Sequence, residues 1–174
     1  MEFIPGQVVV HPHHGPSTVT GVMARKVQGR EVRYVQLEVH HTNLAVSIPE
    51  SKADEVGVRP LLGADALRGV FSVLTSAGEP LDEQWSRRIK AQHELCRSGD
   101  VRTIAGVVRD LTRRDEEKGL SMGEKDLLKD ARTPLVAELA LCLDISEEIA
   151  ESAITTAVIE GSVPSLGGRL PLAV

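Results

Sequence analysis

Two hydrophobic periods divide the chain. In the first 50 residues, short apolar runs and strict alternation of apolar and polar positions predict β-strands. From about residue 61 the apolar residues recur every three or four positions, which predicts α-helices. No period of 20 to 50 residues repeats along the chain, so a repeat architecture is not expected. The pattern therefore indicates an α+β protein built from two different modules.

Turn residues divide the β-rich part into four or five short strands. Gln28-Gly29 and Thr42-Asn43 favour tight turns between alternating runs, and Gly21 within a strand indicates a bulge. Short strands at such spacing predict a small, strongly bent barrel. The expected strands cover residues 7–10, 17–20, 32–39 and 44–48.

Capping signals divide the second part into five helices. Asp100 can cap one helix, and Ser121 with Glu124 fits a capping box at the start of another. Pro134 lies inside this capping-box helix and should kink it, at a cost of about 3 kcal/mol if nothing compensates. The expected helices comprise a first one through Leu67, Val70, Phe71 and Leu74, then 82–98, one after Asp100, one through Leu127 to Leu143, and 146–159.

These patterns give a domain organisation of a β-barrel followed by an all-α helical bundle. We expect the barrel at residues 1–53, a linker at 54–61 and the bundle at 62–160. Residues 161–174 are rich in Gly and Pro and are expected to form a disordered tail.

The only tryptophan of the chain lies in an unusual setting. Trp85 occurs in E-Q-W-S-R-R-I-K, where Arg87, Arg88 and Lys90 follow it closely, while aromatic residues make up 2% of the sequence. A flat side chain beside cations is typical of groups that stack on or wedge into nucleic acid. A tryptophan on a helix can equally be a core residue. Both interpretations remain open at the level of the motif.

The charge balance qualifies the nucleic-acid interpretation. The net charge is −5, whereas a protein that binds DNA mainly through phosphates usually carries a basic excess. Binding to DNA should therefore be weak unless a partner delivers the protein there. The sequence has no membrane-length apolar stretch and no visible signal peptide, so a cytoplasmic location is expected.

Catalytic and metal-binding patterns are weak or missing. No Walker loop, nucleophile elbow or HExxH motif occurs, so neither an enzyme nor a cofactor or small-molecule substrate is expected. His11, His13 and His14, with His40 and His41, could hold a metal, but the H-P-H-H-G run contains no carboxylate or cysteine. A structural loop is the preferred interpretation, and no metal is expected.

Several longer motifs resemble one known family. They are F-x-P-G-Q-V-V-V-H-P-H-H-G, V-G-V-R-P, W-S-R-R-I-K-A, S-G-D-V, V-V-R-D-L-T-R-R-D and L-S-x-G-E-K, in this order over about residues 1–160. They resemble the CarD/CdnL family of bacterial RNA polymerase-binding transcription regulators, in particular its actinobacterial members. The resemblance implies a Tudor-like (SH3-like) N-terminal domain that docks on the polymerase β subunit. It also implies a helical domain that contacts promoter DNA at the upstream edge of the transcription bubble.

The resemblance assigns DNA-contact roles to particular residues. Trp85 would be the wedge that enters the minor groove and hinders bubble closure, with Arg87, Arg88 and Lys90 as phosphate or groove contacts. Lys125 in G-E-K would be a further DNA contact at a helix N-terminus. Little sequence specificity is expected of such minor-groove contacts.

On the polymerase side, the resemblance points to the barrel. Arg25 occupies a contact position, and Val46, Ser47 and Ile48 lie on the edge strand expected to pair with a β-subunit strand. Ser47 stands where relatives usually carry arginine, and a cation at an acidic interface contributes on the order of 1 kcal/mol. Ser47 therefore points to weaker polymerase affinity and to a divergent paralogue.

Two functional hypotheses follow. The first is a regulator that binds RNA polymerase and stabilises the open promoter complex through Trp85. The alternative is a protein-interaction module, or a divergent paralogue, that binds polymerase without stabilising promoter opening.

Overall fold

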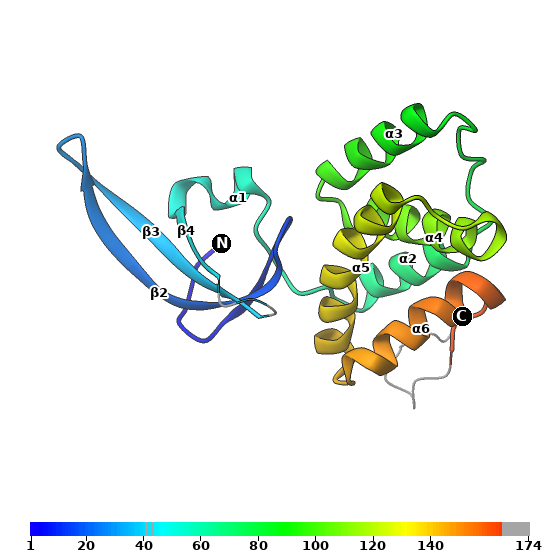
Figure 1. The fold of residues 1–174 in the computed structure, drawn as a ribbon. Helices are drawn as coiled ribbons and strands as arrows, with labels where there is room; N and C mark the ends of the chain where they lie inside the picture. The colour runs from blue at the N-terminus through cyan, green and yellow to red at the C-terminus, as the bar shows by residue number, and fades with distance from the viewer. Residues whose placement is uncertain (41, 43, 165–174) are drawn as a thin grey trace. The chain divides into compact units, whose positions relative to one another are not determined.

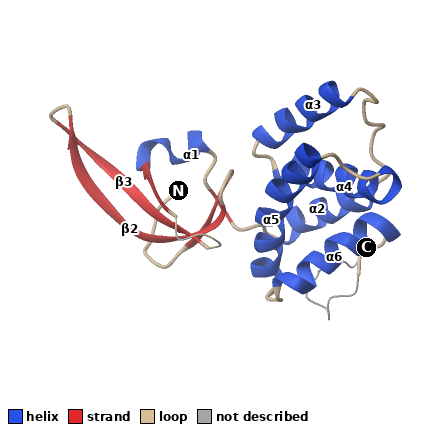
Figure 2. Cartoon of the chain, viewed as in Figure 1, coloured by secondary structure: helices blue, strands red, loops and turns tan. Residues whose placement is uncertain are grey.

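The computed structural model describes residues 1–40, 42 and 44–164. The chain divides into two compact units, Met1–Leu61 and Leu62–Val174. Strands dominate the first unit, and helices and loops make up the described part of the second (Figures 1 and 2). This division agrees with the α+β class that the two hydrophobic periods predict.

The first unit is an antiparallel five-stranded sheet with the strand order β4-β3-β2-β1-β5. Strands β4 and β5 therefore form its two edges. Its elements are β1 Val8–His11, β2 Gly15–Val27, β3 Arg30–Val39, β4 Ala45–Pro49, η1 Glu50–Lys52, α1 Ala53–Val56 and β5 Arg59–Pro60.

The long hairpin of β2 and β3 confirms the predicted turn and bulge (Figure 1). Val27 pairs with Arg30, and Gln28 (φ 51°) and Gly29 (φ 78°) form the two-residue turn between them. Positive φ at both central residues matches the twist of the flanking strands. The pairing register shifts between Val19 and Gly21, where the bulge was expected.

A small core lies on one face of this sheet. On β3, Val35, Leu37 and Val39 are buried while residues between them are more exposed, as strand alternation requires. The buried cluster contains Phe3, Val9, Val19, Val35, Leu37, Ile48, Ala53 and Val58.

The prediction of a linker at residues 54–61 is wrong. These residues belong to the first unit, because β5 adds to the sheet edge with Val9 opposite Pro60 and Val10 opposite Arg59. Val58 is buried in the same core. A two-residue strand leaves too little alternation in the sequence to be recognised, so the segment looked like a connection.

The described part of the second unit contains five helices of more than ten residues. They are α2 Ala64–Thr75, α3 Trp85–Arg97, α4 Val101–Lys118, α5 Met122–Leu143 and α6 Glu147–Glu160. The predicted apolar stripe of α2 is confirmed, since Leu67, Val70, Phe71 and Leu74 are its buried residues. These side chains share one core with apolar residues of α4, α5 and α6.

The helix boundaries follow the capping signals. The Asp100 side chain accepts a hydrogen bond from the Thr103 backbone N–H at 2.8 Å. Ser121 and Glu124 form both bonds of a capping box, and Ser146 caps α6. Gly119, with φ 75°, follows the last residue of α4. α5 continues through Pro134 as one helix.

The end of the described chain lies against the helical core. Val163 is partly buried there, so the expectation of a disordered tail does not hold at this residue. Residues 165–174 of the expected tail lie outside the described residues. Among the helices that the structure describes, none is long and apolar enough to cross a membrane.

Candidate nucleic-acid interface

Trp85 is a surface residue at the start of a helix. It is the first residue of α3 and is 51% exposed. The core interpretation of this tryptophan is therefore wrong. The helix begins three positions later than the sequence pattern suggested, because the Asp82 side chain binds the backbone N–H of Gln84 at 2.8 Å and holds a turn there.

One edge of the indole ring is held by the start of α5. Trp85 Nε1 donates a hydrogen bond to Ser121 Oγ at 2.9 Å. A Cβ placed on Gly123 would lie 4.0 Å from Trp85 Cζ2, so the Gly123 backbone lies close to the same edge. The polar N–H is thus satisfied inside the protein, and half of the side chain still faces solvent.

The Ser121 hydroxyl is itself fixed by Glu124. Ser121 Oγ donates to Glu124 Oε2 at 2.7 Å, and the Ser121 backbone N–H donates to the same oxygen at 3.0 Å. The capping box therefore orients the hydroxyl oxygen toward the indole N–H.

Arg88 lies inside the protein, which corrects its expected role as a DNA contact. Its side chain is 3% exposed, and Nε donates to Glu124 Oε1 at 2.7 Å. Nη1 donates to the backbone oxygens of Asp82 at 2.7 Å and Glu83 at 3.0 Å. The guanidinium thus joins the segment before α3 to the start of α5. The helical period could not reveal this, because the partner carboxylate lies 36 positions away.

Glu124 is the centre of a buried ion-pair network. Its side chain is 2% exposed, and Arg114 Nε of α4 lies 3.4 Å from Oε1. Burial alone would raise the pKa of Glu124, but hydrogen bonds from Ser121 and Arg88 outweigh it and lower the pKa to about 2. Glu124 is therefore ionised at neutral pH and links α3, α4 and α5.

α3 depends on this network more than on apolar packing. Its two buried residues, Arg88 and Gln92, are both polar. Ile89 and Cys96 are only partly buried against the core. The position of Trp85 is consequently set by polar contacts that a change at one residue can break.

The other expected DNA-contact cations are on the surface. Arg87 and Lys90 are exposed on α3, and Lys125 is exposed in the first turn of α5. The structure therefore brings Trp85 and Lys125 to the same place, since Ser121 and Gly123 contact Trp85 and Lys125 follows two positions later. Asp126 is an exposed acidic neighbour on the same helix.

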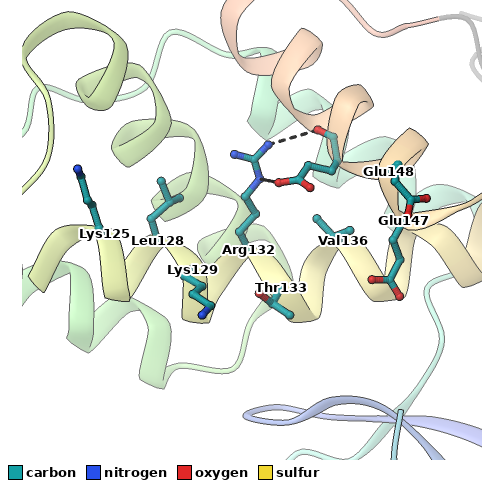
Figure 3. A pocket seen from close by; sticks show the side chains of 9 residues that line it. Lys125, Leu128, Lys129, Arg132, Thr133, Val136, Glu147 and Glu148 are labelled. Atoms are coloured by element: carbon teal, nitrogen blue, oxygen red, sulfur yellow. Dashed lines mark hydrogen bonds and ion pairs between the residues drawn. The ribbon is translucent and has the colours of Figure 1, made fainter. Parts of the chain in front are cut away.

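Lys125 also borders a pocket of about 420 Å³ between α5 and α6 (Figure 3). Lys129 and Arg132 continue along α5, and Arg132 Nε lies 3.5 Å from Glu151 Oε1. The remaining lining residues are Leu128, Thr133, Val136, Glu147 and Glu148. The α5 wall is cationic and the α6 wall is acidic, and Lys125 and Lys129 of the α5 wall are exposed.

Sequence reasoning missed three residues that hold the tryptophan. Ser121 and Glu124 were recognised only as a helix cap, and Arg114 was not recognised as a partner of Glu124. The W-S-R-R and L-S-x-G-E-K motifs are both distinctive in the sequence, and they contain residues that meet in the structure. Nothing in either motif shows that their side chains meet.

The edge strand β4 presents alternate residues to opposite sides. Ile48 is 4% exposed and Val46 is partly buried, and both side chains contact the sheet core. Ile48 can therefore contribute only backbone groups to a partner strand, and strand pairing uses these groups. Ser47 is exposed and lies opposite Gln36 of β3.

Arg25 shares the outer sheet face with Ser47. Its Nε donates to Met23 Sδ at 3.2 Å, and its Cζ lies 5.8 Å from the centre of the Tyr34 ring. Gln36 Nε2 donates to the same sulfur at 3.4 Å. Met23 pairs with Tyr34 and Gln36 with Ser47, so strand alternation puts all five residues on one face. Arg25 thus shares a sheet face with Ser47, although β3 lies between its strand, β2, and the edge strand β4.

His11, His13 and His14 pack against one another in the N-terminal unit. His11 is buried, and its ring centre lies 4.5 Å from that of His14. Burial, together with the nearby His14 and His13, lowers the pKa of His11 to about 4. Within the described ranges, no group of three or more His, Cys, Asp or Glu residues is arranged to hold a metal ion.

Comparisons with known proteins match both units. The family model described as "CarD, C-terminal domain" matches residues 69–155, which is half of the chain. The model described as "CarD-like/TRCF RID domain" matches residues 3–62. The chain belongs to the CarD family, and its N-terminal unit is Tudor-like.

A named bacterial relative supports this assignment. The chain is 27% identical over 143 residues to the Bacillus subtilis (strain 168) protein named "Putative transcription factor YdeB". The alignment covers 82% of this chain and 94% of the relative. The similarity therefore extends over both units.

Proposed function

We propose that the protein is a transcription regulator that binds RNA polymerase and stabilises the open promoter complex. In this proposal Trp85 enters the minor groove at the upstream edge of the bubble, and Arg87, Lys90 and Lys125 contact the DNA backbone. The observation that carries it is a half-exposed indole whose N–H is already bound to Ser121. Family membership and the relative's name support the role in transcription.

A fixed indole suits a wedge for energetic reasons. Separating a base step costs a few kcal/mol, and an inserted apolar group recovers part of that cost. A side chain that is already oriented loses less conformational entropy on insertion than a freely rotating one. About 1.4 kcal/mol of preference for the open complex shifts its population tenfold. Binding alone supplies such a preference, so the proposed role requires no catalysis.

Delivery by polymerase accounts for the acidic net charge. A protein with a charge of −5 gains little from phosphate contacts when it is free in solution. We propose that the N-terminal unit docks on the polymerase β subunit through the edge of β4, with Arg25 as a further contact from the sheet face that carries Ser47. Tethering then raises the local concentration of the helical unit at the promoter. The site of action would be cytoplasmic, at the nucleoid, with little sequence specificity.

The proposal is tested by replacing Trp85 with Ala and with Phe. Open-complex lifetime on a promoter is measured after challenge with a polyanion competitor, and polymerase binding is measured separately. Trp85→Ala should shorten the lifetime while folding and polymerase binding stay unchanged, because the side chain is exposed. Trp85→Phe should retain part of the effect, since it keeps an apolar ring but loses the bond to Ser121. An unchanged lifetime for Trp85→Ala would contradict the proposed insertion of Trp85 into the minor groove.

A second candidate function is that of a divergent paralogue, and Ser47, exposed on the edge strand, is the observation behind it. A member that lacks a cation at this exposed position can occupy polymerase, or another partner, without acting on promoter DNA. The two functions separate when the stability of polymerase with promoter is compared with that of polymerase alone. A gain that requires the promoter supports the first, and an equal effect on both supports the second. Arg25→Glu is the control for docking, since it should abolish either effect.

A further inference from the structure

Met122 is an exposed apolar residue that lies in the chain between two residues that contact Trp85. It is 75% exposed, the highest value among the exposed large apolar side chains in the described part of the chain. It is the first residue of α5, directly after the capping residue Ser121. Its two chain neighbours both approach the indole ring, Ser121 through a hydrogen bond and Gly123 through its backbone.

The Met122 side chain takes part neither in the helix cap nor in the buried core. The capping box uses Ser121 and Glu124, and a side chain that is three-quarters exposed contributes little to a core. Val101, the first residue of α4, is by contrast partly buried against the core. Met122 is therefore free to make a contact outside this chain, and its place between two residues that contact the indole suggests where that contact is.

The charges around Met122 indicate what that contact is. Lys125 and Lys129 follow at spacings of three and seven, which puts them on the same side of α5 as Met122. Both lysines line the pocket shown in Figure 3. Arg87 and Lys90 are exposed on α3, while Asp126 and Asp130 are exposed acidic residues of α5. An apolar tip with such cations around it is complementary to a DNA groove bordered by phosphates.

We propose that Met122 is a second apolar contact at the edge of the opened DNA, next to the Trp85 wedge. Its flexible thioether would pack on the deoxyribose wall or the exposed base step beside the inserted indole. Methionine suits this position because it is unbranched and polarizable and adapts to irregular surfaces. Methionine is also among the side chains that proteins insert at base steps in the minor groove. The inference rests on the proposed function.

Open-complex lifetimes test the inference with four variants of the full chain. Met122→Ala should shorten the lifetime about two- to fivefold, less than Trp85→Ala does, and Met122→Leu should restore most of it. Leu141→Ala is the matched control, since Leu141 is also apolar and exposed on α5, and it should leave the lifetime unchanged. Polymerase binding and thermal melting are measured for each variant.

The outcomes separate this inference from the proposed function. If Trp85→Ala shortens the lifetime and Met122→Ala does not, the Met122 contact is overturned and the proposed function stands. If neither variant changes it, the proposed function fails and the Met122 contact fails with it. A shorter lifetime that follows lower polymerase affinity or loss of folding also overturns the contact.

Crosslinking gives an independent readout. A photoreactive methionine or leucine analogue at position 122 should attach to promoter nucleotides at the upstream bubble edge in the complete polymerase complex. The same group at position 141 should not. Equal labelling of those nucleotides from both positions, or none from 122, overturns the inference.

Discussion

Trp85 Nε1 and Ser121 Oγ lie 2.9 Å apart, and this hydrogen bond joins the first residue of α3 to the capping residue of α5. The same serine binds Glu124, which binds Arg88 at 2.7 Å. The orientation of an exposed indole thus depends on a buried ion pair. Changes that leave Trp85 itself intact should therefore alter what it does.

Replacing Ser121 with Ala removes both the cap and the anchor of the indole. We expect a loss of about 1 kcal/mol in the free energy of unfolding and a shortened open-complex lifetime. Ser146→Ala is the matched control, because Ser146 caps α6 through its Oγ but is not bonded to the indole. Equal lifetimes for the two variants would contradict a role of Ser121 in positioning Trp85.

The neighbouring arginines of W-S-R-R should differ sharply in their effect on stability. Arg88→Met leaves the buried Glu124 carboxylate with the more distant Arg114, whose Nε lies 3.4 Å from Oε1. We therefore expect a loss of about 3 kcal/mol in the free energy of unfolding. Arg87→Met should change the free energy of unfolding by less than about 0.5 kcal/mol, since Arg87 is exposed. Urea unfolding of both variants measures this difference, and similar values for the two would contradict the placement of Arg88.

The exposed cations should determine how strongly the affinity for DNA depends on salt concentration. Arg87→Ala, Lys90→Ala and Lys125→Ala should each lower the slope of log affinity against log salt by about 1, as loss of one phosphate contact does. The measurement uses a DNA fragment with a pre-opened bubble. Lys26→Ala, an exposed cation of the N-terminal unit, is the control. An equal decrease for Lys26 would show that the effect is one of overall charge.

The N-terminal unit should lose stability in mild acid because of His11. Its pKa is lowered from 6.5 to about 4 in the folded state, so the neutral form is favoured by folding. The corresponding stability is fully present above pH 6.5 and is lost as the pH falls toward 4, on the order of 3 kcal/mol in total. A proton NMR titration of the His11 ring should give a midpoint near 4. His11→Asn should reduce the loss of stability over this pH range.

Restoring a cation on the outer face of β4 should strengthen docking on polymerase. Ser47→Arg should raise the affinity about fivefold, since a cation at an acidic interface contributes on the order of 1 kcal/mol. The fold should tolerate the change, because Ser47 is exposed. Ser51→Arg places the same charge at an exposed position of η1 and should have little effect. If both variants bind alike, the gain comes from net charge.

Much of the fold could be predicted because its signals are local. The Gln28-Gly29 turn, the bulge at Gly21 and the caps at Asp100 and Ser121 each depend on residues within a few positions. Strand β5 was missed for the opposite reason. It is two residues long and is defined by pairing with β1, about 50 positions earlier.

The candidate site was only partly predictable. The motif around Trp85 named the correct segment, and Arg87, Lys90 and Lys125 are exposed as a DNA contact requires. Arg88 was misassigned because a helical period shows which residues share a face but not whether that face meets water or a carboxylate. Met122 drew no attention, since a methionine at the start of a helix is unremarkable until its exposure is known.

By itself the sequence determined the two modules, the main helices and strands, the family and the segments that carry the site. These follow from periodicity, turn chemistry and motifs, which are properties of neighbouring residues. Only the tertiary structure decided that Trp85 is exposed and anchored by Ser121 and that Arg88 is buried on Glu124. Those contacts join residues 36 positions apart, and their geometry depends on how α3, α4 and α5 pack around one carboxylate.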